Sequence, residues 1–285
     1  MKKAEFRCID RLRVRWAEVD SQKIVFNGHY LMYFDTAVAA YWRALAMPYH
    51  DTMERLRGDI FVRKATVEYH GSARYDDLCE VGVRCARVGT SSMLFVCALF
   101  RGETLLVSGE LVYVFADPAT QTSRPVPPEL RALFEAFEDG APVLDVRVGT
   151  WDTLGREAQA LRTAVFVDEQ QIPAELEWDA ADANAVHAVA YNRFGLAVAT
   201  GRWIDLDDST AKIGRMAVAQ PLRGSGVGGA VLRALMQSAR DQGKQRVLLH
   251  AQASAVPFYL RAGFSNEGAP FEEAGIAHQA MVQRL

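Results

Sequence analysis

The sequence predicts two domains of the α+β class in one chain, and three observations lead to this prediction. The chain has 285 residues, a length that fits two domains better than one. A helical pattern near residue 30 precedes four strand-like runs divided by short turns, which indicates one long helix against a meandering antiparallel sheet. Beyond residue 139, strands and helices alternate, which is typical of a mixed α/β domain.

In the first half, basic and apolar residues alternate over residues 11–16 and predict a strand. Apolar spacing then predicts a helix that starts at Gly28, with Asn27 as its N-cap, and ends at Pro48. Four further strands are expected at residues 60–70, 78–88, 93–101 and 105–116.

A short helix over residues 129–137 is expected to close the first half. The stretch 138–142 contains Gly140 and Pro142 and is interpreted as a linker. We therefore place the two domains at residues 1–138 and 139–285.

The second half is organised around a glycine-rich loop between a strand and a helix. Strands are expected at residues 143–148, 186–191, 196–204, 212–218 and 247–252, with helices over 151–166, after the loop and over 256–262. Glycines in the loop allow several backbone N–H groups to face one point, and the helix behind adds its positive end. Arg223 adds a cation at the loop's entrance. The stretch predicts a phosphate-binding site.

Composition and charge narrow the class of partner. Hydrophobic residues make up 50% of the chain, charged residues 24%, and the net charge is −3, so we expect neither nucleic acid nor a membrane as partner. No apolar run approaches a membrane span or a signal sequence, which favours a cytoplasmic protein. The cysteines show no C-x-x-C spacing, so we expect reduced thiols and no metal.

Two known nucleotide-binding motifs have to be considered for the glycine-rich loop. Gly224-x-Gly226-x-x-Gly229 fits the dinucleotide fingerprint, but the next strand, 246–252, lacks the acidic residue that would bind a ribose. No Lys-Ser or Lys-Thr follows the glycines, which excludes a P-loop. A nucleotide oxidoreductase stays a weak alternative.

The pattern Gln220-x-x-Arg223-Gly224-x-Gly226-x-Gly228 resembles the acetyl-CoA pyrophosphate loop of the GNAT N-acyltransferase superfamily. The stretches 161–173, 258–264 and 273–278 also resemble that family, so the likeness runs from about residue 143 to the end. It implies acetyl-CoA or another acyl-CoA as co-substrate and an amine as acceptor. The residues it implies for the cofactor are Met216 and Val218, through their main chain, and Arg223, Gly224, Ser225, Gly226, Val227, Gly228 and Gly229.

The same resemblance suggests residues for the chemistry of acyl transfer. Tyr259 takes the place of the tyrosine that protonates the departing thiolate, although it could equally be a packed core residue. Glu169 and Gln170 fall where the family lines its acceptor site, to select the amine or relay its proton, or they cap a helix. His187 and His278 are weaker candidates.

The stretch from Arg15 to Tyr30 resembles the active-site segment of hotdog-fold acyl-CoA thioesterases of the 4-hydroxybenzoyl-CoA thioesterase-like type. The likeness covers about residues 6–137 and implies a long central helix wrapped by an antiparallel sheet, in a homo-oligomer. Asp20 takes the position of the catalytic acid. Asn27 and Tyr30 match polar and aromatic substrate-binding positions at the helix start.

A carboxylate at Asp20 could activate water or attack the thioester itself, and helix N–H groups could hold the oxyanion. The sequence does not choose between base and nucleophile, and an Asp at this place is also a common turn residue. Glu18 is interpreted as a solvated charge at a strand end rather than a second acid. Lys23 stands where the family has a small residue, and could fill the acyl pocket or pair with Asp20.

Both resemblances point to acyl thioesters of CoA. The expected function is therefore bifunctional, with thioester hydrolysis in the first half and acyl transfer to an amine in the second. The alternative is a CoA-binding sensor or scaffold in which one or both domains have lost turnover.

Overall fold

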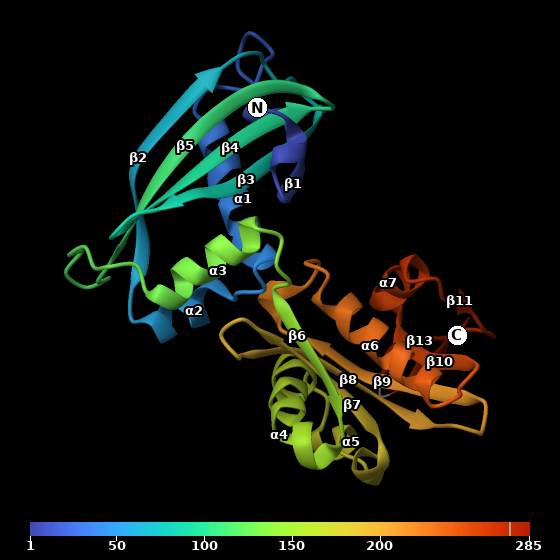
Figure 1. The fold of residues 1–285 in the computed structure, drawn as a ribbon. Helices are drawn as coiled ribbons and strands as arrows, with labels where there is room; N and C mark the ends of the chain where they lie inside the picture. Colours follow the sequence, from blue (N-terminus) through green and yellow to red (C-terminus); the bar gives the residue numbers. More distant parts are fainter. Residues whose placement is uncertain (274) are drawn as a thin grey trace. The chain divides into compact units, whose positions relative to one another are not determined.

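The computed structural model describes residues 1–273 and 275–285, and the chain divides into two compact units, Met1–Val143 and Leu144–Leu285 (Figure 1). Each unit has its own sheet and its own helices. Ala274, part of the 273–278 motif, lies outside the described residues.

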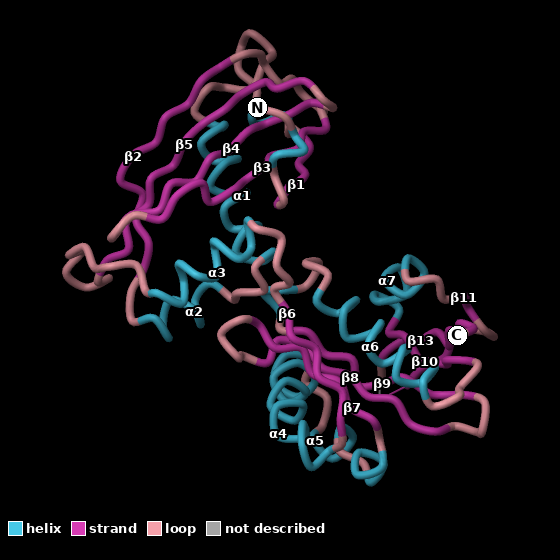
Figure 2. Tube along the Cα trace, viewed as in Figure 1, coloured by secondary structure: helices cyan, strands magenta, loops and turns pink. Residues whose placement is uncertain are grey.

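The first unit is a five-stranded antiparallel sheet around one long helix, α1 (Figures 1 and 2). The strand order is β1-β3-β4-β5-β2, so β1 and β2 form the two edges. Its elements are β1 (Cys8–Arg13), α1 (His29–Ala44), α2 (Tyr49–Leu56), β2 (Asp59–Tyr69), β3 (Leu78–Val88), β4 (Ser92–Arg101), β5 (Thr104–Ala116) and α3 (Pro128–Glu138). The predicted central helix against a meandering sheet is confirmed.

Helix α1 buries one apolar stripe against the sheet, which its sequence spacing anticipates. The buried side chains recur at helical intervals: Tyr30, Tyr33, Phe34, Ala37, Val38, Tyr41 and Trp42. The helix approaches β5 closely because Gly109 has no side chain. A Cβ added there would lie 2.6 Å from the Phe34 ring and 2.7 Å from the Thr66 carbonyl oxygen.

Three local predictions for the first unit were wrong. The first strand begins at Cys8 rather than residue 11, and residues 16–18 form a turn of 3₁₀-helix. Helix α1 ends at Ala44, before Pro48, and Pro48 is instead the N-cap of α2, a helix that the sequence pattern did not predict. The N-cap of α1 is Gly28, without a side-chain cap, so Asn27 does not cap it.

The second unit is an eight-stranded mixed sheet with helices on both faces (Figure 1). The order along the sheet is β11-β13-β10-β9-β8-β7-β6, with β12 paired to β13. Its strands are β6 (Leu144–Gly149), β7 (Val186–Asn192), β8 (Ala197–Asp205), β9 (Thr210–Val218), β10 (Arg246–Gln252), β11 (Ser265–Asn266), β12 (Phe271–Glu273) and β13 (Ile276–Arg284). Its helices are α4 (Trp151–Arg162), α5 (Ala174–Glu177), α6 (Val227–Asp241) and α7 (Val256–Arg261).

The two long helices of this unit cover opposite faces of the sheet (Figure 1). Leu154 and Ala158 of α4 pack on Val189 of β7. On the other face, Leu235 of α6 lies 2.9 Å from where a Cβ on Gly201 of β8 would stand, so α6 sits directly on the strand. Helix α4 continues as a turn of π-helix over Thr163–Glu169, which carries the chain toward β9.

Two findings bear on partners and cofactors. Within residues 1–273 and 275–285, no helix is long and apolar enough to cross a membrane, and no group of three or more His, Cys, Asp or Glu side chains could hold a metal ion. The four cysteines are free, buried thiols. Burial raises the pKa of Cys79 to about 11 and that of Cys8 to about 12, so neither is an activated nucleophile.

Candidate functional site

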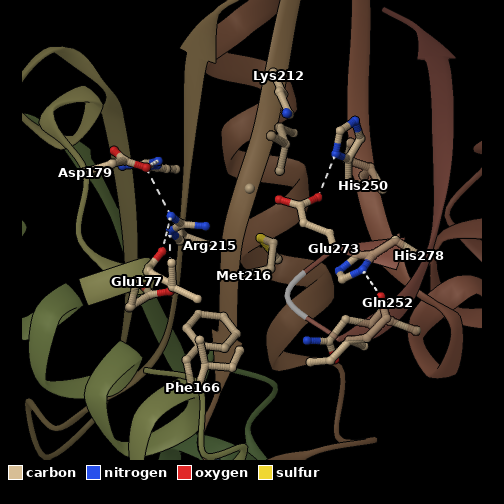
Figure 3. Close-up of a pocket in the computed structure, with 18 of the residues that line it drawn as sticks. Phe166, Glu177, Asp179, Lys212, Arg215, Met216, His250, Gln252, Glu273 and His278 are labelled. Atoms are coloured by element: carbon tan, nitrogen blue, oxygen red, sulfur yellow. Dashed lines mark hydrogen bonds and ion pairs between the residues drawn. The ribbon is translucent and has the colours of Figure 1, made fainter. Parts of the chain in front are cut away.

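Strands β9 and β10 of the second unit stop pairing before either strand ends, and a cavity lies between their unpaired parts. Strands β9 and β10 are parallel and pair only from Thr210–Arg246 to Ile213–Leu249. Beyond that pair, the second half of β9 and the end of β10 line opposite sides of a cavity of about 370 Å³. Figure 3 shows this cavity, with Met216 of β9 on one side and Gln252 of β10 on the other.

A β-bulge shapes the β9 side of the cavity. Thr200 of β8 pairs with Ala217 and Arg202 with Gly214, so Arg215 and Met216 stand opposite Gly201 alone. A bulge leaves one residue out of the ladder and frees its backbone groups. Arg215 has φ 54°, a left-handed conformation that costs energy for a residue with a side chain. The strain lies where the strand faces the cavity.

The glycine-rich loop follows β9 and leads into α6. Gly224 has φ 81° and Gly226, the N-cap of α6, has φ 91°, so both positions favour glycine. The first amide of the helix that bonds back is that of Ala230, to Gly226 at 3.1 Å. The amides of residues 227–229 have no acceptor within the described part of the chain. These free donors lie where the sequence predicted an anion site.

Three predicted site residues make contacts that the sequence did not reveal. Arg223 donates through both terminal nitrogens to the carboxylate of Glu169, at 2.6 Å each. The hydrogen bonds from Arg223 hold the pKa of Glu169 below its usual range. Gln170 lines the cavity and accepts a hydrogen bond from Gln252 at 2.9 Å. Glu169 is therefore joined to the glycine-rich loop, whereas Gln170 faces the cavity.

Tyr259 of α7 lines the same cavity and is buried. Its ring packs edge-on against Phe258 and Phe264. Burial raises the pKa of its hydroxyl to about 12. Among the described residues this hydroxyl has no hydrogen-bond partner, so it keeps its proton and is free to donate it to a bound group.

A buried network of ion pairs forms the wall opposite β10. Arg162 donates to Glu177 at 2.5 Å and to Asp182 at 2.7 Å, with all three side chains buried. Arg202 is hydrogen-bonded to Asp182 and to Asp179, and its bonds to Asp179 lower the pKa of that carboxyl to about 2. Arginine forks satisfy buried carboxylates well. The network anchors the segment after α5 to β8.

Two histidines lie on the β10–β13 side of the cavity (Figure 3). His250 Nδ1 is 3.1 Å from the Glu273 carboxylate. His278 Nδ1 is 2.8 Å from the carbonyl oxygen of Ile276. His187, the other histidine singled out in the sequence, is buried against Trp151 and does not line the cavity.

In the first unit, Asp20 lies in a tight turn before α1. Its Oδ1 accepts the amide of Gln22 at 2.8 Å, and its carbonyl accepts the amide of Lys23 at 2.9 Å. Asp20 thus serves as a turn residue, while its Oδ2 has no partner in the part of the chain that the structure describes. The side chain of Lys23 is exposed and makes no ion pair there with Asp20.

The other two predicted residues of this site differ in their surroundings. Tyr30 is buried and its hydroxyl accepts the amide of Ala73 at 3.0 Å. Asn27 is exposed, and its carbonyl accepts the hydroxyl of Tyr69 at 3.2 Å. Tyr69 in turn packs edge-on against Tyr30. The side chain of Asn27 is therefore available to a ligand, whereas Tyr30 holds the loop that carries Ala73.

The interpretation of Glu18 as a solvated charge was wrong. Glu18 is buried and accepts hydrogen bonds from the Tyr33 hydroxyl at 2.6 Å and from the Arg15 side chain and amide at 2.7 Å. Burial alone works to raise the pKa of Glu18, but the bonds from Tyr33 and Arg15 outweigh it and leave the pKa below its usual range. Its carboxylate ties the segment before Asp20 to α1.

Comparisons with known proteins address each half separately. A model of the acetyltransferase (GNAT) domain matches residues 156–285, and a model of the thioesterase superfamily matches residues 22–108. An uncharacterized N-acetyltransferase of Bacillus subtilis (strain 168), YjcF, is 37% identical over 129 residues, which are 45% of this chain and 91% of that protein.

Two further likenesses concern the first half. An acyl-CoA thioester hydrolase of Escherichia coli O6:H1, YbgC, is 27% identical over 128 residues, 44% of this chain and 92% of that protein. The crystal structure of a DHNA-CoA thioesterase from Staphylococcus aureus covers 47% of this chain and 95% of its own, with a TM-score of 0.43 and 20% identity.

The buried Glu18 yields a pH-dependent prediction. Replacing it by Gln should lower the free energy of unfolding of the first unit by about 1–3 kcal/mol near pH 7, because Arg15 and Tyr33 lose a charged acceptor. The folded-state pKa is depressed, so this contribution is complete above the unfolded-state pKa and is lost as the pH falls through the folded one. Hydrogen exchange across a urea series at pH 7 and pH 3 would measure it.

The exposed Glu68 provides the matched control, since Glu68→Gln should change the unfolding free energy little at either pH. An equal loss for Glu18→Gln at both pH values would contradict the ionic role assigned to Glu18.

Proposed function

Because the chain belongs to the GNAT acetyltransferases through its second half and carries a thioesterase-superfamily domain in its first half, we propose that it is a bifunctional acyl-CoA enzyme. The first unit would hydrolyse an acyl-CoA. The second unit would transfer an acetyl or other acyl group from CoA to an amine. The observation that supports the proposal for the second unit is that β9 and β10 stop pairing beside a loop whose backbone amides are free.

Acyl transfer needs a site for the coenzyme's diphosphate and a channel for its thioester arm. The free amides of residues 227–229 and the positive end of α6 suit the diphosphate. The arm would then run along the open side of β9, past Val218 and Met216, and pair with their main chain. This path brings the thioester carbonyl to the bulge, where unpaired backbone groups could polarise it.

The acceptor amine would enter the same cavity, which Gln170 and part of the ion-pair network line. Tyr259 would give its proton to the departing thiolate, and the proposal is supported by a hydroxyl that is buried, protonated and unbonded to other described residues. In this scheme Glu169 acts indirectly, by positioning Arg223 at the loop.

Thioester hydrolysis in the first unit would depend on Asp20. One oxygen fixes the turn, which holds the carboxylate in a defined direction, and the other oxygen is available to a water or a thioester carbonyl. The start of α1 follows within ten residues of the chain and supplies unpaired N–H groups for an oxyanion. Asn27 at the same end would contact the substrate.

We also propose that the protein is a homo-oligomer through its first unit. Large apolar side chains are exposed there beyond what a solvated monomer needs: Trp16 (77%), Leu78 (62%), Tyr75 (58%), Tyr69 (54%) and Phe26 (52%). Strand β2 adds an open edge of eleven residues whose backbone groups can pair with another strand. A second copy of the chain would cover both features.

Thioester turnover should depend on the Asp20 carboxylate. Asp20→Asn keeps an oxygen for the Gln22 amide but removes the charge, so release of free CoA from a panel of acyl-CoAs should fall a hundredfold or more. Asp117→Asn is the control, because Asp117 also fixes a turn through Oδ1 but lies elsewhere in the unit. Unchanged turnover in Asp20→Asn would remove Asp20 from the mechanism, and acyl-CoA binding without CoA release in the wild type would favour a sensor or scaffold.

Acetyl-CoA should stabilise the second unit by selective binding, by about 2.7 kcal/mol at a hundredfold excess over Kd. Gly226→Asn should abolish the resulting rise in Tm, since its side chain enters the space where the phosphates would lie. Gly243→Asn is a matched control: both glycines have positive φ with nothing near the added Cβ, and Asn tolerates that conformation. A shift that persists in Gly226→Asn would place the coenzyme elsewhere.

The transferase activity itself is tested by mass spectrometry of the products formed from acetyl-CoA with spermidine, tyramine, glucosamine, glycine and an alanyl dipeptide as probe amines. At least one N-acetyl product is expected, and it should vanish in Gly226→Asn together with the shift in Tm.

The oligomer is tested by light scattering of the full chain. The wild type should have twice the chain mass or more, and Trp16→Asp should shift it toward the monomer by placing a charge in the interface. Leu206→Asp, at an exposed apolar position of the second unit, should leave the mass unchanged. A monomeric wild type would refute the proposal.

A further inference from the structure

The hydrogen bond of His278 fixes which of its ring nitrogens carries a proton. Its Nδ1 lies 2.8 Å from the carbonyl oxygen of Ile276, and a carbonyl oxygen can only accept. Nδ1 must therefore donate. In the neutral ring, Nε2 then has a lone pair and no proton. The residue lines the cavity, and Figure 3 shows its imidazole facing the interior across from Met216.

The register of the strands places His278 at the open end of the cavity. On β10 and β13, Gln252 stands opposite His278, whereas His250 stands opposite Ala280. The β9–β10 ladder ends at Leu249, so His250 adjoins the paired end. Two residues of strand separate the two levels by roughly 7 Å. His278 thus lies at the level where β9 is bulged and where the thioester would be attacked.

Each carboxylate that lines the cavity is paired with basic side chains. Asp179 is held by two arginines, with a pKa of about 2. Burial raises the pKa of Glu177, but Arg162 and Arg215 occupy its two oxygens. Burial works to raise the pKa of Glu273, but the hydrogen bond and charge of His250 and the charges of His278 and Lys212 outweigh it and leave the pKa low. The other titratable or charged groups that line the cavity are Arg202, Lys212, Arg215, His250 and Tyr259.

We infer that His278 is the general base of the second unit, an inference that rests on the proposed acyl transfer. The nitrogen of a primary amine forms a bond to the thioester carbonyl carbon and gives one proton to His278 Nε2. The C–S bond then breaks, and the CoA thiolate takes the proton of Tyr259. The proton on His278 returns to the Tyr259 phenolate through solvent, which leaves an N-acyl amine, free CoA and both side chains as they began. Ile276 positions the base through its carbonyl.

Removing the base should change both the rate and its pH dependence. In the full chain, His278→Gln should lower kcat/KM for N-acetylation of the best probe amine by a factor of about 10²–10⁴ at neutral pH. The fall in kcat/KM toward acid pH, which reports protonation of the base, should be absent in the variant. With His278→Ala, added imidazole should restore part of the rate, because it can occupy the vacated space. The rise in Tm with acetyl-CoA should be kept in both variants, which shows that they fold.

His250→Gln separates the two histidines. The His250→Gln variant should keep the fall in kcat/KM toward acid pH. If that fall is lost in His250→Gln and kept in His278→Gln, the inference is overturned. Retention of the fall in His278→Gln would do so by itself.

A second measurement does not depend on activity. Long-range ¹H–¹⁵N spectra of the full chain labelled at histidine, assigned by the resonance lost in His278→Gln, should show the Nδ1–H tautomer for His278. The Nε2–H tautomer would overturn the inference. If none of the probe amines is acetylated, the proposed transferase fails as a whole, and this spectrum still decides whether His278 presents an unprotonated nitrogen to the cavity.

Discussion

The second unit depends on the point at which two parallel strands stop pairing. A parallel ladder normally continues until one strand ends, because each unpaired amide and carbonyl must find another partner. Here β9 and β10 separate after Ile213 and Leu249 while both still run on. The bulge at Arg215 and Met216 turns β9 away, and its backbone groups are left for a ligand. The cavity and the approach to the glycine loop both follow from this separation.

The rest of that unit holds the separated strands in place. The ion pairs from Arg162 through Asp182 to Arg202 join the segment after α5 to β8, so the far wall cannot collapse into the gap. Removing one partner from such a buried network would leave an unpaired charge, which is strongly unfavourable. A comparable tie exists in the first unit, where Glu18 fastens the chain ahead of Asp20 to Tyr33 of α1. In both units a buried carboxylate fixes a segment that lies outside the sheet.

The sequence predicted the regular elements of both units well, for local reasons. Strands β3 and β5 and helix α6 can be predicted from alternating apolar residues, from helical spacing and from the glycines before the helix. These are all patterns among neighbouring residues. Helix α2 was missed because a proline can end one helix and begin the next. The surroundings of Glu18 were missed because its partner, Tyr33, lies fifteen residues away and burial depends on tertiary packing. The pairing of His250 with Glu273, across 23 residues and two strands, left no local pattern.

The ion pair between Arg223 and Glu169 has a consequence for how a coenzyme would be captured. The guanidinium at the mouth of the loop is already neutralised by a carboxylate of the same chain, so it adds little field at a distance. An approaching polyanion is then attracted mainly by the dipoles of the backbone amides at the start of α6. This attraction falls off within the first turn of the helix. Encounter would then owe little to long-range steering, and discrimination between nucleotides would arise at contact, from shape.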